Sequence, residues 1–295
     1  MFHQIMVQQK ITASVTQFLS DNNISTDKFV AVGCDGTNVN TGRSGGVIWL
    51  LEEHYKRPLQ WLVCQLHANE LPLRHLLHHW DSSITGPKAF AGPVGNMLPT
   101  CDKMPVVEYE KIEATLPEVN LPELSTDQQY LWEITNAVST GICSMDLSKR
   151  DPETLNHSRW LTTANRILRL YVANDQPSSS LKVLAEYIAK VYAPMWFNIK
   201  TKPFCKDEAK HLWRTILLSR YLEKPLLDVI DTVIQRNAYF DHAENILHGM
   251  LTDERKHIRE LGLRRIVKAR RHKASDVRQF TIPKLNTVNA QNTMK

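Results

Sequence analysis

AVGCDGTNVNTGRSGG, residues 31–46, joins an apolar run to a turn rich in glycine and asparagine. This pattern predicts a buried strand that ends at Asp35, because turn-forming residues bound strands of this kind. The carboxylate of Asp35 would then lie at the carboxyl end of a strand, where α/β proteins place their ligand sites. Two interpretations are open. Asp35 holds a Mg2+ or Mn2+ ion, or it accepts hydrogen bonds from the turn between Thr37 and Asn40.

Helix and strand patterns alternate on both sides of this segment. The predicted order is helix, strand, helix, strand and helix, over residues 5–19, 28–34, 45–55, 59–67 and 69–80. Strands separated by one helix pair as parallel neighbours. The first part of the chain is therefore expected to form an α/β layer with a parallel sheet.

The rest of the chain has a different character. Residues 81–126 carry many prolines and few periodic runs, so we expect a loop or linker there. Apolar residues then recur at helical spacing, which predicts an all-helical module over residues 127–272 with a basic helix at its end. Residues 273–295 lose this periodicity and form the expected disordered tail. The predicted fold class is α/β plus all-α, with a parallel-sheet core over residues 1–80 followed by the helical module.

Composition limits the classes of protein. Apolar residues make up 42% of the chain and charged residues 23%, which is ordinary for a folded domain and excludes bulk disorder. Five cysteines, an odd number spread widely along the chain, argue against a secreted disulfide framework. No apolar run is long enough for a signal peptide or a membrane span, so no membrane partner is expected. We expect a protein of the nucleus or the cytoplasm.

A second cluster of chemically active side chains lies in CQLHANELPLRHLLHH, residues 64–79. Cysteine and histidine bind zinc, and the spacing of Cys64 and His67 suits a zinc site. However, zinc sites usually use two ligand pairs across a defined spacer, and Cys64 lies in a predicted strand whose side chains enter the core. A packed pair of Cys64 and His67 is therefore the alternative to a zinc site.

Three short motifs, taken in order, resemble those of the hAT superfamily of DNA transposases. They are DGTNVNTG, which begins at Asp35, CQLHANELPLRHLL, which begins about 30 residues later at Cys64, and HSRWLTTANRIL in the helical half. The resemblance spans residues 5–170. The positions that match are Asp35, Asn38, Cys64, His67, Arg159 and Trp160.

This resemblance implies an RNase H-like α/β core interrupted by a helical insertion, with Asp35 as the second of three acids that bind Mg2+ or Mn2+. The family's first acid lies before the helix predicted at residues 5–19, so we expect it to be missing here. The third acid is a glutamate on a late helix, for which only Glu254 and Glu260 are candidates. Two-metal catalysis needs several converging carboxylates. We therefore expect a transposase-derived protein without catalysis that binds nucleic acid or protein.

Two alternatives belong to other classes of function. In the first, sequence outside this chain completes an active, metal-dependent DNA transposase. In the second, the helical module is a protein-interaction scaffold with no role in nucleic-acid binding. A partial sheet also leaves the edge of the strand at residues 28–34 unpaired, and such an edge is expected to promote self-association.

Positive charge is concentrated near the end of the helical module. Residues 252–273 hold nine Lys or Arg against three Asp or Glu, an excess of six, whereas the whole chain has an excess of five. Such a helix can neutralise DNA phosphates or direct nuclear import. It can equally be a solvated helix supported by pairs such as Glu260 with Arg264. The residues expected to bind nucleic acid are Arg264, Arg265, Lys268, Arg270, Arg271 and Lys273.

Overall fold

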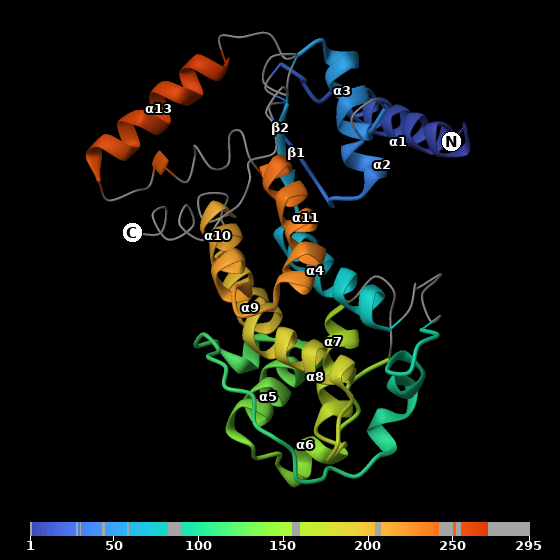
Figure 1. The fold of residues 1–295 in the computed structure, drawn as a ribbon. Helices are drawn as coiled ribbons and strands as arrows, with labels where there is room; N and C mark the ends of the chain where they lie inside the picture. Colours follow the sequence, from blue (N-terminus) through green and yellow to red (C-terminus); the bar gives the residue numbers. More distant parts are fainter. Residues whose placement is uncertain are drawn as a thin grey trace. The chain divides into compact units, whose positions relative to one another are not determined.

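The computed structural model divides the chain into two compact units (Figure 1). The first unit consists of Met1–Ala68, Phe204–Leu212 and Gln235–Lys284, and the second of Asn69–Pro203, Trp213–Ile234 and Leu285–Lys295. The structure is mostly helical with one small parallel sheet, which agrees with an α/β part and a helical part. It describes residues 2–27, 29, 31–42, 45–57, 59–81, 90–154, 160–203, 208–241, 250–251 and 255–270.

The α/β layer lies in the first unit and has the predicted order of helix, strand, helix and strand, with one further short helix, α2, in the predicted turn. Its helices and strands are α1 (Phe2–Asp21), β1 (Ala31–Cys34), α2 (Asn38–Thr41), α3 (Val47–Tyr55) and β2 (Gln60–Val63). The strands pair in parallel, with Ala31 opposite Gln60 and Cys34 opposite Val63. The predicted parallel pairing is confirmed, and it brings the carboxyl ends of both strands to the same edge of the sheet.

A small apolar core holds this layer together. Val47 and Leu51 on α3 are buried with Leu59, and partly buried apolar residues of α1 and β1 pack against them. The buried carboxylate of Glu52 joins α3 to β2, because its Oε1 accepts hydrogen bonds from the Leu59 backbone N–H and from Trp61 Nε1, both at 3.0 Å. These bonds satisfy an oxygen that would otherwise be costly to bury.

The predicted end of the second strand is wrong. β2 stops at Val63, and α4 (Gln65–Trp80) begins four residues before Asn69, so Gln65–His67 is helical. The physical reason is that a short apolar run suits a buried strand and a buried helix equally well.

Pro72 lies inside α4 and has no N–H to donate to the carbonyl of Ala68, four residues earlier. The side chain of Asn237, on α11 (Lys224–Asp241), donates to that carbonyl instead, from Nδ2 at 2.9 Å. A polar side chain distant in sequence thus supplies the hydrogen bond that the proline removes.

The remaining elements of the described residues are helical. They are η1 (Gly95–Lys103) and η2 (Leu121–Glu123), both 3₁₀ helices, then α5 (Thr126–Thr140), α6 (Met145–Lys149), α7 (Trp160–Tyr171), α8 (Ser179–Tyr187), the π-helical turn η3 (Ile188–Tyr192), α9 (Ala193–Thr201), α10 (Glu208–Ser219), α11 and α13 (Lys256–Arg270). The segment expected as a loop therefore contains two short 3₁₀ helices, whereas residues 104–120 form neither helix nor strand. No helix of the described residues is long and apolar enough to span a membrane.

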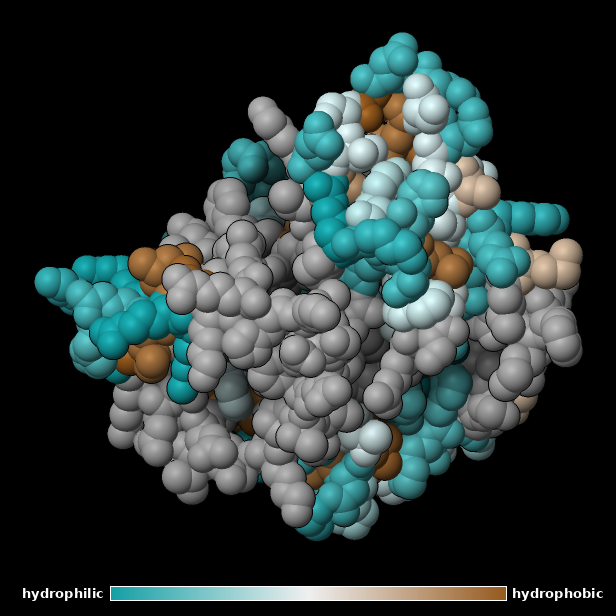
Figure 2. All heavy atoms as spheres, turned by 90° about the horizontal axis from the view of Figure 1, so that it is seen from above, coloured by the Kyte–Doolittle hydropathy of each residue, from teal (hydrophilic) through white to brown (hydrophobic). Residues whose placement is uncertain are grey.

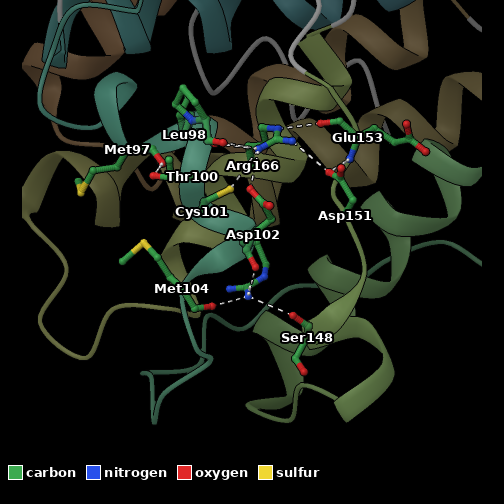
Figure 3. A network of polar contacts seen from close by, with 12 residues as sticks. Met97, Leu98, Thr100, Cys101, Asp102, Met104, Ser148, Asp151, Glu153 and Arg166 are labelled. Atoms are coloured by element: carbon green, nitrogen blue, oxygen red, sulfur yellow. Dashed lines mark hydrogen bonds and ion pairs between the residues drawn. The ribbon is translucent and has the colours of Figure 1, made fainter.

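Helix α7 forms the centre of the second unit. All twelve of its residues are buried, including Arg166 and Arg169, and it packs against α5, α8 and η1. Figure 3 shows Arg166 between η1 and the segment that carries Asp151 and Glu153. The two arginines tie these irregular segments to the central helix through hydrogen bonds to their carbonyl groups.

Candidate functional site at the carboxyl end of the sheet

The parallel sheet brings the first two sequence motifs together. Asp35 follows β1 and Cys64 follows β2, and the Cys64 backbone N–H donates to the Cys34 carbonyl at 2.8 Å. Since α4 begins at Gln65, His67 lies in its first turn. A Cβ added at Gly36 would lie 3.1 Å from His67 Cδ2, so the histidine ring packs directly on this glycine. Glycine at position 36 permits this close approach.

The carboxylate of Asp35 is engaged in its own turn. Its Oδ1 accepts a hydrogen bond from the Thr37 backbone N–H at 3.0 Å, one from Thr37 Oγ1 at 2.6 Å and one from Asn40 Nδ2 at 2.8 Å. These are the contacts that the turn interpretation predicts. Asp35 fixes the loop that joins β1 to α2.

These contacts also set the acidity of Asp35. Partial burial alone would raise its pKa, but the hydrogen bonds from Thr37 and Asn40 and the nearby His67 outweigh it, and the pKa falls below its usual value of 3.8. The hydrogen bonds favour the charged form because an ionised carboxylate is the stronger acceptor. Asp35 is therefore ionised at neutral pH.

Asn38 and Asn40 have different roles in this turn. Asn38, the position that matches the family motif, is exposed, and its carbonyl accepts a hydrogen bond from Gln8 Nε2 at 3.4 Å. Asn40 is the asparagine that contacts Asp35. This contact belongs to the turn between Thr37 and Asn40 from which Asp35 was predicted to accept hydrogen bonds.

The prediction that Cys64 enters the core is wrong. Cys64 is exposed, because β2 has already ended at Val63 and the chain turns into α4 there. Cys34 is half-buried, and burial, together with Asp35 and Cys64, raises its pKa to about 11. Among the residues that the structure describes, no group of three or more His, Cys, Asp or Glu side chains is arranged to hold a metal ion.

The other histidines of the cluster lie farther along α4. The rings of His75 and His78 stack with centroids 6.5 Å apart. Burial lowers the pKa of His78, and Arg74 and His75 lower it further, so a neutral imidazole is favoured there.

The third motif falls partly outside the described residues. Arg159 is not described, whereas Trp160 is the first residue of α7 and is 7% exposed. Trp160 is therefore a packing residue of the second unit, as a tryptophan in the first turn of a buried helix usually is.

Asn69 was missed as a structural residue of the second unit. It is buried on α4, and its Nδ2 donates to the Tyr192 carbonyl at 3.1 Å. Tyr192 ends the π-helical turn η3, where the widened helix alters its backbone hydrogen-bond pattern. Asn69, which follows Cys64 and His67 in the sequence, thus connects α4 to the helical module.

The predicted basic helix is present as α13. Its fifteen residues carry six Lys or Arg and one acid, Glu260. Arg264 and Arg265 are exposed, and Lys268 and Arg270 lie in the same helix. Glu260 pairs with Lys256 at 3.8 Å and with Arg264 at 3.5 Å, which are exposed contacts of the kind that support a solvated helix. Arg271, Lys273 and Glu254 lie outside the described residues.

Apolar atoms also reach the surface of α13. Figure 2 shows hydrophilic and apolar atoms side by side at the surface of this helix. The exposed apolar residues are Leu261, Leu263 and Val267.

Comparison of the chain with models of known protein families, with curated proteins and with solved structures finds no significant match.

Proposed function

We propose that this chain derives from a hAT-type DNA transposase and acts by binding nucleic acid through α13, without cleaving it. The observation that supports nucleic-acid binding most strongly is the charge of this helix. Six positive side chains against one acid leave α13 with an excess of five, equal to the net charge of the whole chain. Charge concentrated in this way attracts the phosphate backbone, whereas the remainder of the chain is neutral on balance.

The arginines of α13 differ in how far their charge is compensated. Glu260 pairs with Lys256 and Arg264. Arg265 is exposed, and no carboxylate of the described residues forms an ion pair with it. An exposed guanidinium without a carboxylate partner can contact a phosphate without first breaking an ion pair.

The relation to the transposase family is supported by the arrangement of the α/β layer. The order helix, strand, turn, helix, strand, helix suits the part of an RNase H-like core that carries the second acid. In this proposal Asp35 occupies that acid's position and Cys64 with His67 the following motif. The three donors on Asp35 Oδ1 support a role in holding the turn. The basic C-terminal segment is also of the kind that directs nuclear import, so the proposed location is the nucleus.

Binding of a short DNA duplex across a salt series tests this function. We expect an affinity that falls steeply with salt, because bound Lys and Arg release counterions from the phosphates. The double variant R264Q/R265Q is expected to lower the log–log salt slope by about 2, one unit for each phosphate contact removed. The control K10Q/K149Q removes two exposed charges outside α13 and is expected to leave the slope unchanged.

DNA cleavage is measured in the same samples after Mg2+ is added. The proposal predicts intact duplex at all times. Cleavage that Asp35→Ala abolishes would instead favour the transposase completed by other sequence. Equal loss of binding in both double variants would show that only net charge matters, and an absence of binding at every salt concentration would favour the protein-interaction scaffold.

A further inference from the structure

Three arginines of the second unit differ in their charge partners. Arg150 pairs with Glu133 and Asp146, and Arg166 pairs with Asp102 and Asp151. Arg169 is the most buried of the three, at 1% exposure, and no ion pair joins it to any carboxylate of the described residues. The arginine that is farthest from water is thus the one without a negative partner.

The hydrogen bonds of Arg166 and Arg169 show the same contrast. Every side-chain nitrogen of Arg166 has an acceptor, including carbonyl oxygens of η1 and the carboxylate of Asp151 (Figure 3). Arg169 donates from Nη2 alone, to the carbonyls of Asp102, Met104 and Ser148 at 3.4, 2.6 and 3.1 Å. Its Nε and Nη1 are buried without a hydrogen-bond partner among the residues that the structure describes. Two charged donors therefore remain unsatisfied, which is costly for a buried cation.

The hydroxyl of Tyr130 is a third unsatisfied donor. Tyr130 lies on α5, is 1% exposed, and its oxygen has no hydrogen-bond partner among the described residues. Helix α5 packs against α7, and Asn165, one turn before Arg169, donates from Nδ2 to the carbonyl of Asp127, one turn before Tyr130, at 2.9 Å. Burial raises the pKa of Tyr130 although the Arg169 charge opposes the rise, so the phenol is neutral.

The neighbouring thiols do not supply the missing negative charge. Burial raises the pKa of Cys101 to about 11, although Arg166 and Arg169 oppose the rise. Burial likewise raises the pKa of Cys143 against the effect of Arg169. Both cysteines are therefore protonated at neutral pH and cannot act as counterions.

We propose that Arg169, through Nε and Nη1, and the Tyr130 hydroxyl bind a small inorganic anion of the size and charge of chloride inside the second unit. A water molecule would satisfy donors but would leave the positive charge uncompensated. An anion satisfies the donors and the charge together. The anion is small because the donor atoms are inaccessible from the surface.

Thermal unfolding of the full chain in sodium chloride and in sodium gluconate at equal ionic strength tests the site. Gluconate is too large to enter it. We expect the midpoint to rise by about 3 °C for each tenfold increase in chloride above its dissociation constant, and to stay constant in gluconate. Tyr130→Phe removes one donor and is expected to reduce the chloride-dependent rise.

Tyr187→Phe is the matched control. Tyr187 is also fully buried in the second unit with an unpaired hydroxyl, but burial alone shifts its pKa, and no arginine contributes. This variant is expected to keep the full chloride response. Equal responses of the wild type and Tyr130→Phe, or equal midpoints in chloride and gluconate, would overturn the proposal.

A crystal structure from bromide-containing solution adds a direct test. We expect an anomalous peak within hydrogen-bond distance of Arg169 Nη1. A water molecule at that position, with no anomalous signal, would show that the donors are hydrated and that no anion binds.

Discussion

At the scale of single residues, Asp35 shows how a strand-terminal acid can serve the turn that follows it. Its Oδ1 receives three hydrogen bonds from Thr37 and Asn40. Gly36, the next residue, gives the His67 ring room to pack. Asp35, Gly36 and His67 thus form one local structure at the edge of the sheet.

Asp35→Ala is expected to lower the free energy of unfolding by about 1 kcal/mol at neutral pH, because it removes these partly exposed hydrogen bonds. The folded-state pKa of Asp35 lies below its usual value of 3.8, so the ionised form stabilises the fold. This contribution is complete above pH 3.8 and is lost as the pH falls through the folded-state pKa. Urea unfolding from pH 2 to 7 measures it. A difference between wild type and variant that does not change with pH would contradict this explanation.

At the scale of secondary-structure elements, side-chain amides donate hydrogen bonds to backbone carbonyls of irregular helices. Asn237 donates to the Ala68 carbonyl left free by Pro72, and Asn69 donates to the Tyr192 carbonyl at the end of η3. Both donors are buried, and the loss of either would leave a backbone carbonyl without this donor.

Asn237→Ala is expected to destabilise the protein by about 1 to 2 kcal/mol, because the Ala68 carbonyl loses its donor. In a Pro72→Ala background the backbone N–H of residue 72 can donate to the same carbonyl, so the cost of Asn237→Ala should fall by at least half. Chemical denaturation of the four proteins in this double-mutant cycle measures the coupling. An equal cost of Asn237→Ala in both backgrounds would show that Asn237 does not replace the hydrogen bond that Pro72 removes.

At the scale of the whole molecule, the α/β layer has uncovered apolar surface. The described residues form a parallel sheet of only two strands, although such sheets usually have more strands and are covered on both faces. On α1, Gln8 and Thr12 are buried, whereas Val7, Ile11 and Phe18 are exposed. The outer edges of a two-stranded sheet and an exposed apolar stripe both favour association.

We therefore expect the protein to self-associate in a concentration-dependent way. Phe18→Glu places a charge in the exposed stripe and should shift the equilibrium towards the monomer. Ile142→Glu is the matched control, since Ile142 is 75% exposed in the second unit and lies outside this stripe. Sedimentation velocity over a hundredfold concentration range measures the effect. A monomer throughout this range, or an equal response of both variants, would contradict the expectation.

The sequence by itself determined the order of the main elements, the parallel pairing of β1 with β2 and the helical second half, and it gave the turn contacts of Asp35 as one of two interpretations. These features depend on apolar periodicity and on residues close together in the chain, which can be read locally. Tertiary structure alone decided the end of β2, the exposure of Cys64 and of the apolar stripe on α1, and the burial of Arg169 without a carboxylate partner among the described residues. It also joined Asn69 to Tyr192, 123 residues away, and Asn237 to Ala68, 169 residues away. The physical reason is that burial and hydrogen-bond pairing depend on which distant surfaces meet, and no local pattern encodes that choice.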